Sequence, residues 1–288
     1  MKQPQTQPEY VQAGQLRMYC ETQGNTQGKS RPLLLLHAGF ATIETSFEKL
    51  RPLLAKRGIT MAVEQQGHGH TADLDRPLAY EQMVEDTAAV LRHKKIADAD
   101  VFGWSDGGIV ALGLAARHPD LVRRVATIGA GYNTDAEKPD FKQRLASMKP
   151  DNEHTLPFRD AYRKVAPAPD QWPLLVEKVK AMYAGFKGWS AQEMQSLKAP
   201  LMVMLGDDDF TRPEHALELF RMVPFGRLAI LPGSDHSAPV LRAEWVAAML
   251  IDFFDAPDEE FVTSKPANDQ PNQQIGRASC RERVWSDV

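Results

Sequence analysis

Residues 101–109, Val-Phe-Gly-Trp-Ser-Asp-Gly-Gly-Ile, place a serine between two glycines, directly after an apolar run and directly before a segment with helical character. A chain that turns this sharply from a strand into a helix holds the residue at the turn in a strained backbone conformation. Glycines two positions before and two positions after that residue let the chain close. Gly103 and Gly107 meet this need. An ordinary glycine-rich loop also fits the five-residue pattern, but the flanking strand and helix favour a nucleophile elbow at Ser105.

Strand and helix patterns alternate on both sides of this turn. Strands are predicted at 10–21 (a hairpin), 32–36, 59–63, 100–104, 121–128, 200–205 and 227–231. Helices are predicted at 47–56, 80–93 and 107–118. A further helix is predicted to begin at a capping box at 211–214 and to end at Val223. A last helix is predicted to present Leu241, Trp245, Met249 and Phe253 on one face. Such alternation predicts an α/β fold, in which a parallel sheet carries helices on both sides.

The alternation stops between Gly131 and Leu197, where six prolines accompany short helical patterns. We predict a helical cap inserted at 132–197, between two parts of one α/β core at 10–131 and 198–255. The composition turns polar after residue 255, which predicts a disordered tail at 256–288. Within that tail, residues 275–288 resemble the translation of a sequencing adapter, and we interpret them as an artefact without function.

The composition excludes several classes of function. The chain has 288 residues, a net charge of −4 and no basic patch, which argues against partners such as nucleic acids or anionic membrane surfaces. No apolar run approaches the roughly 18 residues of a membrane span, and residues 1–10 are rich in Gln and Pro and do not contain the apolar region of a signal peptide. A cytoplasmic protein is therefore expected. Cys20 and Cys280 offer neither a disulfide framework nor a metal-ligand spacing. A small molecule is the expected partner, and nothing indicates the oligomeric state.

Four motifs follow one another along the chain: His37-Ala38-Gly39, Gln66-Gly67-His68-Gly69, the serine elbow, and late loops that carry aspartates and a histidine. With them the chain, over about Tyr10 to Phe254, resembles the α/β-hydrolase superfamily. The resemblance implies an eight-stranded, mostly parallel sheet, catalytic residues at the carboxyl ends of strands, and no cofactor. The second motif departs from the family's commoner Asp-x-Arg-Gly, because the chain has Glu64-Gln65-Gln66-Gly67 there.

The residues themselves supply a candidate catalytic set. A serine hydroxyl is a poor nucleophile at neutral pH, so it needs a base to take its proton and a carboxylate to orient that base. His236 follows the last predicted strand and is the candidate base. The family's acid matches the fourth position of Gly206-Asp207-Asp208-Asp209, which indicates Asp209, with Asp207 as the alternative. The chain order Ser105, Asp209, His236 is the order used by this fold.

Acyl transfer also needs donors for the developing oxyanion. The backbone N–H of Asp106 and that of Gly39 are the candidates, with Phe40 as an alternative for the second. The run from Gly103 to Gly108 resembles the valacyclovir-hydrolase-like branch of the superfamily. In that branch an acid beside the nucleophile binds a cationic amino group of the substrate. The resemblance therefore implies that Asp106 is a substrate-binding residue. Asp106 could instead pair with an Arg or Lys of the cap, or cap local backbone. The candidate substrate-binding residues are Phe40, Trp104, Asp106 and Trp172.

Other polar residues have structural explanations. His68 and His70 with Asp73 suggest a metal site, but the glycines of that loop make it too flexible for a defined ligand set, so none is predicted. His215, in a polar context, is expected at the surface.

These features predict a serine hydrolase that cleaves a small carboxylic ester, lactone or related acyl compound through an acyl-enzyme. Cofactor-free haloperoxidase or carbon–carbon hydrolase chemistry remains open on the same residues. A hydrolase-like small-molecule receptor with little turnover is the alternative from another class, and an inactive scaffold is a third. Repeated turnover that depends on all three residues would distinguish an enzyme from a receptor.

Overall fold

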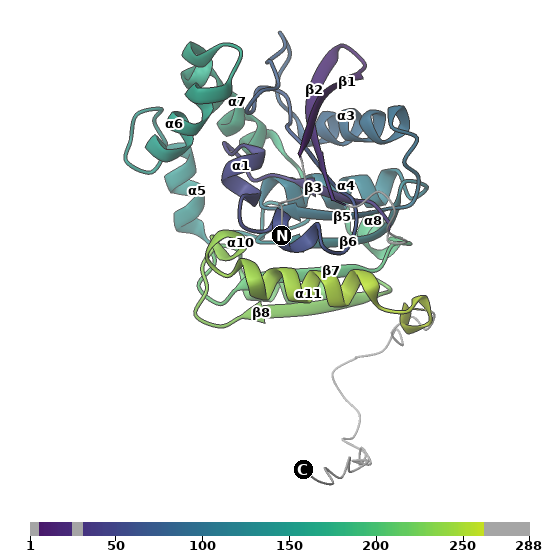
Figure 1. Ribbon diagram of the computed structural model, residues 1–288. Coiled ribbons are helices and arrows are strands. Elements are labelled where there is room, and N and C mark those ends of the chain that lie inside the picture. The colour runs from purple at the N-terminus through teal and green to yellow at the C-terminus, as the bar shows by residue number, and fades with distance from the viewer. Residues whose placement is uncertain (1–5, 25–30, 262–288) are drawn as a thin grey trace, which may run out of the picture.

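The computed structural model describes residues 6–24 and 31–261, which form a sheet of eight strands with helices on both faces (Figure 1). The strands lie in the order β1-β2-β4-β3-β5-β6-β7-β8. β1 and β2 pair antiparallel, as do β2 and β4, and every other pair is parallel. Their bounds are β1 Gln7–Ala13, β2 Leu16–Gln23, β3 Leu33–Leu36, β4 Thr60–Val63, β5 Ala99–Trp104, β6 Val122–Ile128, β7 Leu201–Gly206 and β8 Gly226–Leu231. The predicted α/β fold with a mostly parallel sheet is confirmed.

The helices fall into two groups, those that cover the sheet and those between β6 and β7. The first group is α1 Ile43–Phe47, α2 Arg51–Leu54, α3 Tyr80–His93, α4 Asp106–Arg117, α9 Pro213–Met222, α10 Ala238–Leu241, α11 Ala243–Asp255 and the 3-10 helix η2 Asp258–Phe261. The second group, called the insertion here, is α5 Pro139–Ala146, α6 Leu156–Val165, η1 Pro169–Gln171, α7 Trp172–Gly185 and α8 Ala191–Gln195. Figure 1 shows α5, α6 and α7 gathered at one end of the sheet, apart from the helices on its faces.

Successive residues of a strand point to opposite faces of the sheet, and helices cover both faces. Both sets of side chains are therefore buried. In β3, Leu34 and Leu36 pack with α3 and α4 in one apolar cluster. Leu33 and Leu35 pack with α1 and α11 in the other cluster. β3 is therefore apolar at every position, as is typical of strands in parallel sheets covered by helices.

Two helix starts differ from the prediction. The helix predicted at 47–56 is only the short α2, Arg51–Leu54, while the preceding α1 ends at Phe47. Pro52 lacks the N–H that would continue one helix through both segments. The capping box predicted at 211–214 is wrong. Helix α9 begins at Pro213 with Arg212 as its N-cap, and no side chain caps it.

The chain stays ordered beyond the predicted end of the core. Residues 258–261 form η2, where the predicted tail should already have begun. Arg124 is fully buried, so its charge needs a partner, and Asp258 accepts its hydrogen bond at 2.5 Å. Helix η2 thus lies within the predicted tail, and the predictions for residues 262–288, the adapter-like segment included, lie outside the described residues.

In the part of the chain that the structure describes, no helix is both long enough and apolar enough to cross a bilayer.

Removal of a central core side chain should cost far more stability than the same change at the surface. We expect Leu35→Ala to lower the free energy of unfolding by about 2–5 kcal/mol, because Leu35 is fully buried in the sheet. Leu174→Ala on α7, where the side chain is 46% exposed, should stay within about 0.5 kcal/mol of the parent. Urea unfolding of the three proteins checks this, and equal losses for both variants would contradict the packing described here.

Candidate active site

Ser105 lies at the turn between β5 and α4, in a backbone conformation that L residues rarely adopt (φ 56°, ψ −123°). Both flanking glycines are required by crowding. A Cβ atom added to Gly103 would lie 2.1 Å from the carbonyl oxygen of Gly107. A Cβ atom added to Gly107 would lie 2.1 Å from the carbonyl oxygen of Leu36, at the end of β3. The elbow predicted from the sequence thus has the geometry that its glycines indicated.

Asp209 and His236 meet in the loops that follow β7 and β8. His236 Nδ1 lies 2.9 Å from Asp209 Oδ1, and the amide of Thr211 donates to the same oxygen at 3.0 Å. The Asp209 side chain is 1% exposed and that of His236 is 20% exposed. The buried carboxylate is thus oriented by backbone and aimed at an imidazole that remains accessible.

Asp207, the alternative acid, has a different set of partners. Its two carboxylate oxygens accept hydrogen bonds from the amides of Gly233 and Ser234, at 3.0 and 3.1 Å. These backbone donors lower the pKa of Asp207. Asp207 therefore fixes the loop that leads to His236, whereas Asp209 contacts the imidazole itself.

Gly129, which the sequence analysis did not single out, provides the space for this pair. It follows β6 directly and has a positive φ of 61°. A Cβ atom added there would lie 2.6 Å from His236 Nδ1 and 2.9 Å from Asp209 Oδ2. The one signal in the sequence is a glycine immediately after a buried strand, at the edge of the sheet where the elbow lies.

Three aromatic rings hold His236 in place. The ring of Phe210 lies 3.9 Å from the imidazole, and Phe141 of α5 stacks on Phe210 with 3.7 Å between centroids. Trp104 Nε1 donates a 3.0 Å hydrogen bond to the carbonyl oxygen of His236. Trp104 was predicted near the substrate, and it also anchors the histidine loop.

The loop after β3 lies against the elbow. A Cβ atom added to Gly39 would lie 2.4 Å from Asp106 Oδ2, so only glycine leaves room for that carboxylate. Phe40 has a positive φ of 62°. Gly39, Phe40 and Asp106 all line the pocket that contains Ser105. In the described part of the chain the loop hydrogen bonds use none of these three amides, so all three are candidate donors.

The Asp106 side chain pairs with a tyrosine. Tyr80, fully buried on α3, donates its hydroxyl to Asp106 Oδ1 at 2.9 Å. Burial raises the pKa of Asp106, and the hydrogen bond from Tyr80 opposes that shift. The expected alternatives, an Arg or Lys of the insertion or local backbone, are not what the carboxylate contacts.

A pocket of about 230 Å³ joins these groups to the insertion. Its lining is mostly apolar. Besides the polar side chains of the elbow and of the histidine loop, it includes those of Glu137 and Tyr183. Phe141 and Phe210 also line it, and the sequence analysis proposed neither of them, nor Glu137, for the site. Trp172 does not line it. Its ring is fully buried 6.0 Å from that of Phe40, and its Nε1 donates to the carbonyl oxygen of Pro150 at 2.7 Å.

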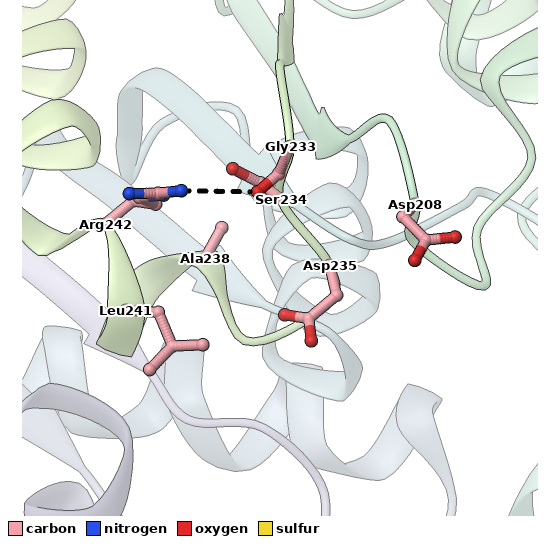
Figure 2. Close-up of a pocket in the computed structure, with 7 residues that line it drawn as sticks. All are labelled: Asp208, Gly233, Ser234, Asp235, Ala238, Leu241 and Arg242. Carbon is pink, nitrogen blue, oxygen red and sulfur yellow. Dashed lines mark hydrogen bonds between the residues drawn. The ribbon is translucent and has the colours of Figure 1, made fainter.

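A wider recess of about 550 Å³ lies beside the histidine loop, and it is not part of this site. Figure 2 shows Arg242, Asp208 and Asp235 around it, with Arg242 reaching the carbonyl oxygen of Gly233 at 3.4 Å. Neither Ser105 nor His236 lines this recess.

The loop that suggested a metal site is built from internal contacts. His70 Nδ1 lies 3.0 Å from Glu64 Oε2, and His68 is buried, which lowers its pKa. Asp73 accepts a 2.5 Å hydrogen bond from Lys178 of α7. Across residues 6–24 and 31–261, no group of three or more His, Cys, Asp or Glu side chains could hold a metal ion.

His215, expected at the surface, is buried on α9. Its ring stacks on Tyr132, with 4.7 Å between centroids, and its Nε2 accepts the Tyr132 amide at 3.3 Å. The expectation is wrong because the aromatic residue at the start of the insertion covers this histidine.

Comparison with known proteins agrees with this geometry. A family model described as "Alpha/beta hydrolase family" matches residues 33–249. A pimeloyl-[acyl-carrier protein] methyl ester esterase of Neisseria meningitidis serogroup A is 26% identical, over 80% of this chain and 78% of that protein. The mouse serine hydrolase BPHL is 24% identical, over 77% and 78%. The crystal structure of an enol-lactonase from Burkholderia xenovorans superposes with a TM-score of 0.70 at 21% identity, covering 86% of this chain and all of that one.

Gly129→Ala should disrupt the His236–Asp209 pair, because the added methyl group would overlap both side chains. We expect hydrolysis of a short p-nitrophenyl ester to fall by about 10²-fold, the cost of misplacing a reacting group by about 1 Å.

Gly14→Ala is the matched control, because Gly14 has a φ of 60° but no atom near its added Cβ. It carries the same backbone strain without the clash and should keep its activity. Equal activity of the two variants would show that Gly129 serves only backbone conformation.

Proposed function

The chain belongs to the alpha/beta hydrolase family, and we propose that it is a serine hydrolase that cleaves a small carboxylic ester, lactone or related acyl compound. In this proposal Ser105 is the nucleophile, His236 the general base and Asp209 the carboxylate that orients His236. The observation that carries it is the 2.9 Å contact between His236 Nδ1 and Asp209 Oδ1, beside a serine that lines the same pocket as the imidazole.

The chemistry follows from the way the imidazole is held. With Nδ1 carrying its proton toward Asp209, Nε2 keeps a lone pair and accepts the proton of the Ser105 hydroxyl. The serine oxygen attacks the acyl carbon, His236 passes the proton to the departing alcohol, and an acyl-enzyme forms. Water then attacks the acyl-enzyme with His236 again as base, which releases the acid and restores the serine.

The negative charge that develops on the acyl oxygen needs fixed donors. We assign the backbone N–H groups of Asp106 and Gly39 to this role, with Phe40 as the alternative for the second. The first residue of a helix has no partner for its amide within the helix, and the helix dipole adds positive potential there. Loss of one such donor typically lowers kcat by about 10²–10³-fold.

The pocket supports a small substrate with apolar character. Its volume of about 230 Å³ and its lining of aliphatic and aromatic side chains suit a short acyl or alcohol group. The relatives named as a methyl ester esterase and as a serine hydrolase point to the same class of bond. No cofactor is needed for this reaction.

We further propose that the segment 132–197 acts as a cap on the pocket. Residues from α5, α6 and α7 contribute to the wall opposite the elbow, among them Phe141, Phe158 and Val179. Lys178 of α7 clamps the segment to the core, since its ammonium group reaches Asp73 as well as the carbonyl oxygens of Leu74 and Arg76, at 2.5, 2.8 and 2.9 Å.

A fluorophosphonate probe tests the proposal without a chosen substrate. We expect single-site covalent labelling of the parent protein, detected by intact mass, and no labelling of Ser105→Ala or His236→Ala. Absence of labelling in the folded parent would sink the proposal and favour a receptor or an inactive scaffold.

Substitutions of Asp209 and of Asp207 should differ in their effect on kcat. Asp209→Asn should lower kcat for ester hydrolysis by about 10⁴-fold, because the amide no longer holds the imidazole in the reactive tautomer. Asp207→Asn should lower it far less, since Asp207 contacts only the backbone of the histidine loop. Steady-state kinetics of both variants decide the matter, and the reverse order of effects would assign the acid to Asp207.

A further inference from the structure

A groove of about 390 Å³ lies between α5 and α7 of the insertion, and we call it the lysine groove. Neither Ser105 nor His236 lines it, so it is distinct from the catalytic pocket. Both helices and the two segments that flank them contribute to its lining, which consists of Thr134, Lys142, Leu145, Ala146, Lys180, Tyr183, Ala184, Phe186 and Lys187. Leu145 and Tyr183 also line the catalytic pocket, so the two cavities share part of a wall.

The apolar part of the lysine groove is rigid. Leu145 and Phe186 are each 6% exposed and belong to the larger apolar cluster of the molecule. The ring of Phe186 packs edge-on against Tyr80 and against Trp189, with 4.7 and 5.3 Å between centroids. A preformed apolar surface of this kind favours contact with an aliphatic group of a ligand over contact with water.

Three lysines give the groove a positive charge, and no acidic residue is among those that line it. The ammonium group of Lys180 pairs with Glu177 of the same helix at 3.0 Å. Lys142 acts on Glu137 from a longer distance and lowers its pKa. In the described part of the chain, neither Lys142 nor Lys187 has a carboxylate within ion-pair distance. Internal acids therefore offset the charge of the groove only in part.

We propose that the lysine groove is a second ligand site, which binds a small molecule composed of a short aliphatic chain and a terminal anionic group. The chain lies on Leu145 and Phe186, and the anionic group contacts the ammonium groups of Lys142 and Lys187. Lysine recognises carboxylate and phosphate groups alike, because its ammonium group acts as a point charge. This site does not depend on the proposed hydrolysis, since it contains none of the residues assigned to that reaction.

Hexanoate is a suitable probe, and its binding can be measured by a ligand-observed NMR titration of the Ser105→Ala protein. We expect hexanoate to bind more tightly than hexanol, which lacks the charge, and more tightly than acetate, which lacks the chain. The affinity for hexanoate should fall as sodium chloride is added, because Lys187 is exposed and Lys142 is half-buried, so salt screens both charges.

Substitution of the two lysines tests the charged half of the site. Lys142→Gln together with Lys187→Gln should raise the Kd of hexanoate about fivefold to thirtyfold, because each exposed ion pair contributes up to about fivefold. Lys164→Gln is the matched control, since Lys164 is an exposed lysine of α6 that does not line the groove. It should leave the Kd unchanged.

A change of volume tests the apolar half without any change of charge. Ala184, an exposed residue of α7, lines the groove, and the ring introduced by Ala184→Trp should occupy the space that the chain needs. We expect this variant to lose most of its affinity for hexanoate. Ala181→Trp, at an exposed position of the same helix outside the groove, should bind hexanoate like the parent.

The outcomes are distinct from those of the hydrolase proposal. Absence of hexanoate binding, equal binding of hexanoate and hexanol, or binding that survives the double lysine substitution would overturn the second site. Binding of phosphatidylglycerol vesicles that depends on the same two lysines would assign the groove to a membrane surface and would also overturn it. Fluorophosphonate labelling of Ser105 bears on the hydrolase alone, so either proposal can fail while the other stands.

Discussion

The contact between backbone atoms at the elbow is the constraint on which the rest of the site depends. The start of α4 lies so close to β5 and to the end of β3 that neither Gly103 nor Gly107 has room for a methyl group. This packing places the amide of Asp106 and the loop from His37 to Phe40 side by side. The candidate nucleophile and the candidate oxyanion donors are thus positioned by backbone, which does not depend on side-chain rotamers.

The histidine is held differently, by side chains from distant parts of the chain. Asp209, Phe210 and Trp104 contact it from three directions, and Gly129 leaves the space in which it lies. Phe141, from the insertion, stacks on Phe210. Orientation of the imidazole is therefore coupled to the packing of the insertion as well as to the core.

The parts of the structure that local sequence patterns encode were predictable. The strand-helix alternation and the elbow glycines follow from periodicity and sterics. The position after a strand indicated the aspartate loop, whereas the choice of Asp209 over Asp207 came from the resemblance to the family. What depends on contacts between distant residues was not: Phe210 and Glu137 reach the pocket through a bridge between residues 137 and 211. Trp172 was expected in the pocket because it is aromatic, but hydrogen bonding to Pro150 turns it into the insertion. Asp258 extends the fold because it neutralises Arg124, a pairing across more than a hundred residues.

The bridge between Glu137 and Thr211 also bears on how new specificities could be built on this scaffold. Residues 136–138 belong by sequence to the insertion, but their backbone completes the loop that holds Asp209. A chimaera that exchanges the helices for those of a relative should therefore be joined after Lys138, so that the donor supplies the walls of the pocket while the recipient keeps the strand-like pairing beside its acid. If the junction lay before residue 136, the relative's residues would replace the backbone that supports the Asp209 loop, in addition to the lining of the pocket.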